Sequence, residues 1–437
     1  MGKHADRTTS TRRTTSTRRN AIRYGGAVAG AGLLAGCLGA GSGAPGSDGG
    51  SGGPDGTDGS DDAEAGGPAG SDGEGTDGDG SAGSYSVEMA PVGEVTLDTV
   101  PGDVMVYSLL YADMAVAFGH GDAVNSLGFD ADAGGNTLDA YYAELDGVEF
   151  DREGIRQLNT GSGDGISVDR ELLYELDSDL HLADPCLFAS FEGWDEGDVA
   201  EVRDNVAPWF GNVFSRRNSE PPESCRDGYE YYGLWEIAER VAGVFREPER
   251  FEALSSVHDG LIETVQADLP PEGERPAVGT LLYMDGTYYP SRLDDPGFAN
   301  AHVRPFGVVD AFGADDVTYE TAYDHEQLLE VDPDVILHQY GVESYYDVAG
   351  VREELADHPV AGELSAIEND RFYPSGNPVQ GPIMNLFQIE MTAKQLFPER
   401  FGEWPAYELG DGYPEIPESE RLFDRGRVAE IVAGDSE

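Results

Sequence analysis

Aromatic and arginine side chains gather in two regions of the sequence, 194–235 and 283–346. Aromatic rings form the walls of pockets for large planar or chelate ligands, and arginine pairs with anionic groups on such ligands. In α/β proteins the loops that follow strands line the ligand crevice. The predicted ligand-binding residues are Tyr107, Ser108, Trp209, Arg216, Arg217, Tyr283, Tyr288, Arg292, Gln339 and Tyr340. Core packing or solvated surface is the alternative interpretation of each.

Motifs typical of enzymes are incomplete. His325-Glu326 begins the His-Glu-x-x-His pattern of zinc hydrolases, but Leu329 occupies the position of the second histidine. A Gly-x-Ser-x-Gly sequence at 49–53 lies in a Gly-rich stretch without the strand and helix that a nucleophile elbow requires. We predict neither catalytic residues nor a resident metal or cofactor. Catalytic triads leave no contiguous signature, so an exported lipoprotein enzyme is the alternative class. Several tyrosines lie near His338 in the sequence, so direct ligation of bare iron(III) by these side chains stays an alternative.

Cys186 and Cys225 are two of the three cysteines in the chain. Outside the cell such a pair favours a disulfide, which here closes a loop of about 40 residues and contributes about 3–4 kcal/mol. A metal site is the alternative interpretation, but only His181 lies near the pair in sequence.

The N-terminus carries an export signal. Arg18-Arg19 precedes a short, weakly apolar stretch that ends in Leu34-Ala35-Gly36-Cys37. A membrane-spanning helix needs about 20 apolar residues, more than this stretch offers. The order of features predicts a twin-arginine lipoprotein signal over 1–36 and lipidation of Cys37. A basic disordered tail is the alternative.

Residues 38–84 consist almost entirely of Gly, Ser, Asp, Ala, Pro and Thr, with no aromatic residue. Such a composition cannot bury enough apolar surface to offset the entropy of ordering the chain. We therefore expect 37–84 to be a disordered tether between the lipid anchor and a folded body.

The charge balance is strongly acidic: 84 Asp and Glu stand against 27 Lys and Arg, and the formal net charge is −57. Lysine is confined to Lys3 and Lys394. Molar salt screens the self-repulsion that such a charge causes. The composition resembles that of proteins from extreme halophiles, and it argues against nucleic acid as a partner. An acidic interaction surface is the alternative, but the charge is spread along the whole chain.

An internal repeat indicates how the body is organised. Residues 171–182 align with 326–337, and each copy is typical of a helix end, a tight Asp-Ser-Asp or Asp-Pro-Asp turn and a short buried strand. The repeat predicts two similar α/β lobes over 85–245 and 270–437. Between them, apolar residues at helical spacing from Pro248 to Leu269 predict a long helix within 246–269. Spacing alone leaves open whether this helix is a spine or packs on one lobe.

These segments resemble the ABC-importer substrate-binding proteins for iron–siderophore complexes and cobalamin. Both repeat copies are similar to the family's Glu-x-Leu…Pro-Asp-Leu-Val motif, with Ser178 in place of proline in the first copy. Residues 366–373 are similar to its Ala-Val-Lys-Asn-Gly-Arg-Val-Tyr segment. The resemblance covers 91–434 and implies an α/β fold of two lobes joined by one long hinge helix, with a ligand cleft between them. The stretch from Cys186 to Cys225 is longer than the family pattern.

The resemblance also implies a function. It predicts an extracellular, lipid-anchored solute-binding protein, monomeric, that captures an iron(III)-siderophore-type chelate and delivers it to an ABC permease and its ATPase. Cobalamin or haem are the alternative ligands. Carried over by motif, Glu171 and Glu326 would dock on arginines of the permease; an ordinary helix-terminal glutamate is the alternative for each. One packed helix between the lobes implies small lobe motion.

Overall fold

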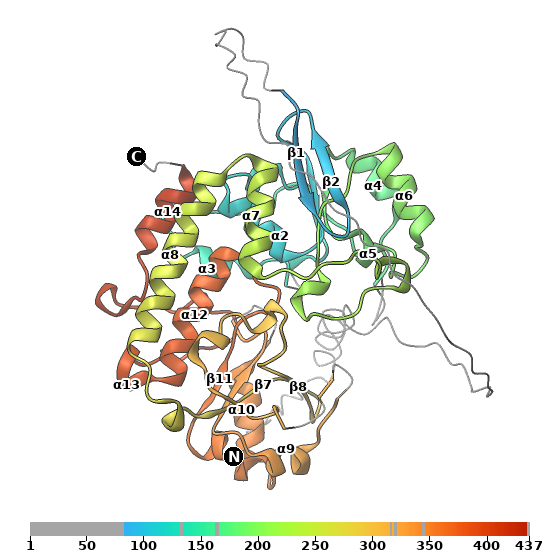
Figure 1. The fold of residues 1–437 in the computed structure, drawn as a ribbon. Coiled ribbons are helices and arrows are strands. Elements are labelled where there is room, and N and C mark those ends of the chain that lie inside the picture. The colour runs from blue at the N-terminus through green and yellow to red at the C-terminus, as the bar shows by residue number, and fades with distance from the viewer. Residues whose placement is uncertain are drawn as a thin grey trace, which may run out of the picture.

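The computed structural model describes residues 83–131, 134–161, 166–314, 317–318, 321–342 and 346–434. It shows two α/β lobes beside a long helix, so the predicted fold class is confirmed (Figure 1). The predicted export signal, Cys37 and the tether lie outside the described residues.

The N-terminal lobe is formed around short parallel strands. Its strands are β1 (Tyr85–Met89), β2 (Gly93–Leu97), β3 (Val104–Val106), β4 (Ser126–Leu127), β5 (Arg156–Gln157) and β6 (Leu180–Leu182). Its helices are α2 (Leu109–Ala117), α3 (Thr137–Tyr142), α4 (Arg170–Leu176), α5 (Pro185–Phe188), α6 (Glu196–Asn205) and α7 (Leu234–Phe245), with the 3-10 turns η1 (Gly121–Ala123), η3 (Phe214–Arg216) and η4 (Glu223–Cys225). Strand β3 pairs in parallel with β6, β4 pairs in parallel with β5, and β1 and β2 form an antiparallel hairpin.

The C-terminal lobe contains a five-stranded sheet of order β11-β10-β7-β8, with β9 also paired to β7. Its strands are β7 (Ala277–Met284), β8 (Thr287–Ser291), β9 (Val309–Asp310), β10 (Val335–His338) and β11 (Phe372–Pro374). Its helices are α9 (His325–Val331), α10 (Val348–Asp357), α11 (Ser365–Glu368), α12 (Pro382–Leu396), α13 (Pro398–Phe401) and α14 (Arg425–Ala433), with the 3-10 turns η5 (Glu272–Glu274), η6 (Phe298–Asn300), η7 (Arg304–Phe306), η8 (Ala361–Glu363) and η9 (Glu418–Glu420). Only β8 is antiparallel to its neighbour.

The two repeat copies fold alike. Helix α4 leads through Asp177 into β6, and α9 leads through Asp332 into β10; both aspartates are left-handed, with φ of 48° and 46°. The second aspartate of each turn binds the start of the neighbouring parallel strand, β3 or β7: Asp179 accepts from the backbone N–H of Asp103, and Asp334 from that of Ala277. The repeat therefore specifies where β6 and β10 join their sheets.

The long helix is α8 (Pro248–Ala267), and it packs against α7 of the N-terminal lobe and against η7 and α14. Helix α12 is buried along its whole length and contacts α2, α3, α7 and α8. One hydrophobic core consequently runs through both lobes, while each lobe also has a smaller core of its own. This shared core couples the lobes much more tightly than a single connecting helix would.

A buried carboxylate joins the lobes at the start of α12. Asp113 on α2 accepts hydrogen bonds from the backbone N–H of Ile383 (2.9 Å) and from the hydroxyl of Tyr142 (2.5 Å). Burial raises the pKa of Asp113 to about 7, and these hydrogen bonds oppose the rise. Asp113 therefore caps α12 from the opposite lobe.

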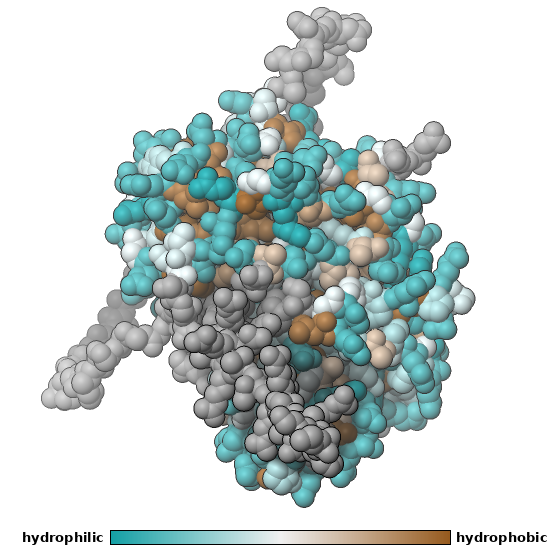
Figure 2. All heavy atoms as spheres, turned by 180° about the vertical axis from the view of Figure 1, so that it is seen from behind, coloured by the Kyte–Doolittle hydropathy of each residue, from teal (hydrophilic) through white to brown (hydrophobic). Residues whose placement is uncertain are grey.

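Hydrophilic side chains cover most of the described surface visible in Figure 2. Among the residues that the structure describes, none of the helices combines the length and apolar character needed to cross a bilayer.

Candidate functional site

A cavity lies between the lobes at the carboxyl ends of their parallel strands. It is partly open to solvent and offers about 80 Å³ to the centre of a water-sized molecule. The N-terminal lobe contributes the loops after β3 and β4 and the segment around η3, and the C-terminal lobe contributes the loops after β10 and β11. The lining residues are Tyr107, Ser108, Leu109, Leu127, Gly128, Phe129, Gly134, Gly135, Leu187, Val213, Phe214, Arg216, Arg217, Ser219, Tyr340, Asn377 and Val379.

Half of the predicted ligand-binding residues line this cavity: Tyr107, Ser108, Arg216, Arg217 and Tyr340. Tyr107 and Ser108 are there because β3 ends at Val106 and Ser108 starts α2. Gln339 precedes Tyr340 in the loop after β10 and is buried, and its side-chain nitrogen has no described partner.

Three predicted residues lie elsewhere. Trp209 is buried against His181 and Phe188 of the N-terminal lobe. Tyr283 and Tyr288 face each other across the β7–β8 hairpin in the core of the C-terminal lobe. Strand β7 runs to Met284 and turns directly into β8, so both tyrosines lie inside a hairpin and not in a loop at the cavity. Because residues inside a hairpin are held by cross-strand pairing, their rings pack with the core and do not line the interlobe cavity.

The polar ends of these two tyrosines are already occupied. The Tyr283 hydroxyl donates to Glu354 (2.9 Å), and the Tyr288 hydroxyl is 2.8 Å from Nδ1 of His325. Burial raises the pKa of both tyrosines. Within the described residues there is no group of three or more His, Cys, Asp or Glu placed to hold a metal ion.

Arg216 places a buried positive charge at the wall of the cavity. Its side chain is 4% exposed, it forms no ion pair with any described carboxylate, and its Nη1 has no hydrogen-bond partner there. Burial lowers the pKa of Arg216 to about 10, and the adjacent charge of Arg217 acts in the same direction. Arg217 also lacks a described ion pair, and its Nε is buried without a partner. With a pKa of about 10 Arg216 still carries its charge at neutral pH, so the cavity wall presents a buried cation that is paired with none of the described carboxylates.

The rest of the wall is mostly aromatic and aliphatic. The Tyr107 ring lies 6.0 Å from the ring of Phe129 and 5.6 Å from that of Phe188, and burial raises the pKa of its unpartnered hydroxyl. Tyr340 reaches the cavity through a left-handed backbone conformation (φ 59°). The following Gly341 lies so close to Pro374 that a Cβ would be 2.4 Å from its Cα. Tyr340 is therefore held rigidly at the end of β10.

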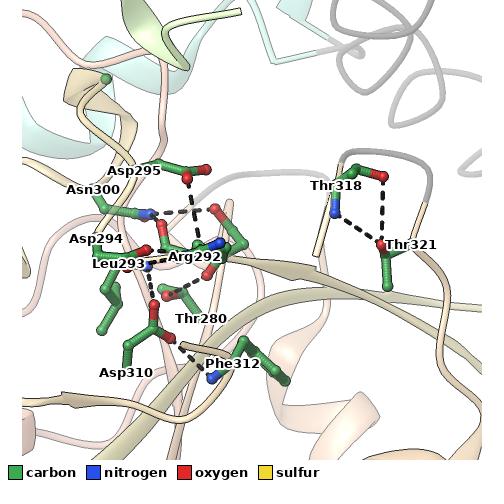
Figure 3. Close-up of polar contacts among 12 residues, drawn as sticks. Thr280, Arg292, Leu293, Asp294, Asp295, Asn300, Asp310, Phe312, Thr318 and Thr321 are labelled. Carbon is green, nitrogen blue, oxygen red and sulfur yellow. Dashed lines mark hydrogen bonds and ion pairs between the residues drawn. The ribbon is translucent and has the colours of Figure 1, made fainter. Parts of the chain in front are cut away.

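A second cavity adjoins the first and shares Arg216 and Arg217 with it. Arg292 lines this second cavity, but Asp294 binds its Nε (2.8 Å) and Nη2 (2.6 Å), with Asp295 nearby (Figure 3). The charge of Arg292 is thus matched within its own loop, whereas Arg216 forms no ion pair with any described carboxylate.

Several lining residues were not predicted. Phe129 and Val379 follow strands β4 and β11, so the rule that loops after strands line the crevice would have found both. Leu187 and Phe214 belong to the stretch between Cys186 and Cys225, where irregular structure gives no periodic signal.

The predicted disulfide is confirmed: Cys186 and Cys225 are joined, with an S–S distance of 2.08 Å. Glu171 and Glu326 are both exposed, and each is the second residue of its helix, α4 or α9. The repeat therefore places the two glutamates at equivalent positions on the two lobes.

Comparisons with known proteins agree with this architecture. An iron uptake ABC transporter substrate-binding protein from Streptococcus pneumoniae aligns with 72% of this chain and all of its own, at 13% identity and a TM-score of 0.50. A periplasmic solute-binding protein from Mycobacterium smegmatis aligns over 72% of this chain and 98% of its own, at 16% identity and a TM-score of 0.50. A periplasmic binding protein from Veillonella parvula aligns over 72% of this chain and 97% of its own, at 13% identity and a TM-score of 0.50.

No protein-family model and no curated protein sequence matches the chain. At these low identities the structural likeness establishes the fold: the chain has the two-lobed fold of the substrate-binding proteins of ABC importers.

Proposed function

We propose that this protein is an extracellular, lipid-anchored solute-binding protein that captures an anionic iron(III)-siderophore-type chelate and delivers it to an ABC importer. The fold supports solute binding, and the cavity between the lobes supports the class of ligand.

The unmatched charge of Arg216 is the observation that carries this proposal. An isolated buried cation costs several kcal/mol of solvation free energy, which only a nearby anion regains. The chain has 84 acidic residues, yet none of the described ones pairs with Arg216. An anionic ligand would supply the missing charge, and the guanidinium fork suits carboxylate or catecholate oxygens.

Lining residues from both lobes indicate how the ligand would be held. Tyr107 and Phe129 from one lobe and Tyr340 from the other provide aromatic surface around the two arginines. A bound chelate would therefore contact both lobes, with its anionic oxygens on the arginines and its apolar parts on the rings.

Tryptophan fluorescence of the mature protein in molar salt, titrated with ferric catecholate, ferric hydroxamate, cobalamin and haem, tests the proposal. We expect saturable quenching by the anionic ferric catecholate and loss of that response in Arg216→Gln. Arg292→Gln is the matched control, because its charge is already paired with Asp294, and it should bind like the wild type. Equal affinity of wild type and Arg216→Gln, or no response to any chelate, would contradict the proposal.

Glu171 and Glu326 would then dock on the permease. Both are exposed in the first turn of equivalent helices, and paired charges at matching surfaces set register and association rate. We predict that reversing both charges, as in Glu171→Arg with Glu326→Arg, abolishes chelate uptake while ligand affinity stays unchanged. Uptake assays on cells and titrations on the purified variant measure the two effects. Lost ligand binding in the double variant would argue against docking.

A further inference from the structure

The segment Asn212–Arg217, called the arginine segment below, has little regular structure. Only the short 3-10 turn η3 lies within it. It nevertheless holds two neighbouring cations at the cavity wall, where their mutual repulsion acts to displace them and no described carboxylate forms an ion pair with Arg216. Another part of the molecule must therefore fix its position.

Asn212 is bound by Tyr111, Ala90 and Glu230, and Asp184 makes the contacts that hold the next two residues. Its Oδ2 accepts hydrogen bonds from the backbone N–H of Val213 (2.8 Å) and from the hydroxyl of Tyr229 (2.6 Å). The same Tyr229 oxygen accepts from the backbone N–H of Phe214 (3.1 Å). The Asp184 carboxylate thus holds two consecutive backbone amides of the arginine segment. It accepts directly from the N–H of Val213, and it positions the Tyr229 hydroxyl that accepts from the N–H of Phe214.

The other oxygen of Asp184 connects this support to α5. Oδ1 accepts from the backbone N–H of Cys186 (2.8 Å) at the start of that helix, and Cys186 is bonded to Cys225. Asp184 is 1% exposed and forms no ion pair with a described cation. Burial raises the pKa of Asp184 to about 6, while its hydrogen bonds oppose the rise. Burying a carboxylate costs solvation free energy, and the packing of its side chain alone does not account for an arrangement with three hydrogen-bond donors.

The contact to Cys186 caps α5, because Asp184 is the N-cap of that helix, whereas the contacts to Val213 and Tyr229 reach beyond it. The strand β6 ends before Asp184, and α5 is a single turn with a proline at its first position. What the carboxylate connects is the start of α5, Tyr229 and the arginine segment, which are far apart in the sequence.

We propose that Asp184 is the positioning residue for the anion-binding arginines, and that it acts by holding the Val213 and Phe214 amides so that Arg216 and Arg217 face the cavity. This inference rests on the proposed function for its ligand but on the contacts above for its geometry. Asp184 touches no ligand; it acts through the backbone that carries the arginines.

Hydrogen exchange and chelate binding, measured on the same variants of the full mature protein, test the proposal. In Asp184→Asn the side chain can no longer accept from all three donors. We expect the amides of 213–217 to exchange about tenfold faster or more, and the affinity for a hexadentate ferric catecholate to fall about tenfold. Tyr229→Phe, which keeps the carboxylate and removes the bridging hydroxyl, should give smaller changes in the same direction.

Asp113→Asn is the matched control. Asp113 is equally buried and also accepts from a tyrosine hydroxyl and from backbone N–H groups, but at α12, away from the arginine segment. We expect faster exchange at the start of α12 and unchanged chelate affinity. If Asp184 had only a structural role, Asp184→Asn would resemble Asp113→Asn: exchange would become faster near the substituted residue, and the chelate affinity would stay unchanged.

The two parts of the experiment separate two possible failures. Unchanged exchange over 213–217 in Asp184→Asn and in Tyr229→Phe would overturn the positioning role, whatever the ligand. Faster exchange in these variants, with no chelate binding by the wild type, would support the positioning role and overturn the proposed ligand class.

Discussion

Arg216 and Arg425 are both almost completely buried, at 4% and 2% exposure, but their surroundings are opposite. Arg425 forms ion pairs with Glu390 (2.8 Å) and with Glu144, and it lies over the ring of Phe387 (5.1 Å). Arg216 pairs with none of the described carboxylates and lies at the wall of a cavity.

The difference separates a structural charge from a charge kept for a ligand. Arg425 connects α14 to α12 and to the loop after α3, so its charge is neutralised within the shared core of the lobes. A buried ion pair is costly to break because the remaining partner stays buried and charged. The removal of an unpaired buried cation has the opposite effect. It takes away a desolvation cost in the folded protein, and it weakens only the binding of a ligand at that site.

The largest effect is expected for Arg425→Met. It leaves the fully buried Glu390 without its cation, and we predict a loss of about 3–5 kcal/mol in the free energy of unfolding. Denaturant titration in molar salt measures it. A loss below about 1 kcal/mol would remove the contrast between the two arginines.

The disulfide offers the next largest effect. Replacing Cys186 and Cys225 by serine opens a loop with a sequence separation of 39 residues and should cost about 3–4 kcal/mol of stability. Native-state hydrogen exchange should show the loosening around the arginine segment and not in α12, where Arg425 is bound. Equal loosening in both regions would mean that the disulfide acts only on global stability.

Arg216→Met should do the opposite of Arg425→Met. We predict unchanged or higher stability without ligand, because a desolvated and unmatched charge is removed. The affinity for ferric catecholate should fall about 10- to 100-fold, the usual worth of hydrogen bonds to a charged group. Thermal melts and fluorescence titrations of one preparation give both numbers. Clear destabilisation would show that Arg216 has a structural partner after all.

The last prediction concerns pH and the capped start of α12. Asp113 has a pKa of about 7 in the folded protein, above its ordinary value of 3.8, so the folded state holds this proton at higher pH than the unfolded chain does. Its contribution to stability is therefore complete below about pH 4 and is lost as pH rises through 7. Asp113→Asn should flatten the stability profile between these values by on the order of 1 kcal/mol per pH unit. An unchanged slope would assign the pH dependence to other groups.

The sequence predicted much of the fold because its signals are local. The repeat at 171–182 and 326–337 identified α4–β6 and α9–β10, since a helix end, a left-handed aspartate and a buried strand are specified by neighbouring residues. Helix α8 followed from apolar spacing for the same reason. The disulfide followed from a count of cysteines and the expected compartment.

Predicted residues that line the cavity either follow a strand directly or, like Arg216 and Arg217, stood out as cations in an acidic chain. Tyr107, Ser108 and Tyr340 satisfy that rule and line the cavity, whereas Tyr283 and Tyr288 do not, because β7 and β8 form a hairpin that sequence alone did not reveal. Hairpin pairing is a contact between segments, and the alternation of side chains along a single strand does not report it.

By itself, then, the sequence determined the α/β class, the duplicated helix–turn–strand units and the residue types available for an anionic aromatic ligand. Tertiary structure alone decided that Arg425 is paired while Arg216 has no partner among the described carboxylates, because ion pairing depends on which distant carboxylates the fold brings within reach. It also decided that Asp184 supports the arginine segment, because that contact joins α5 to residues 29 positions away.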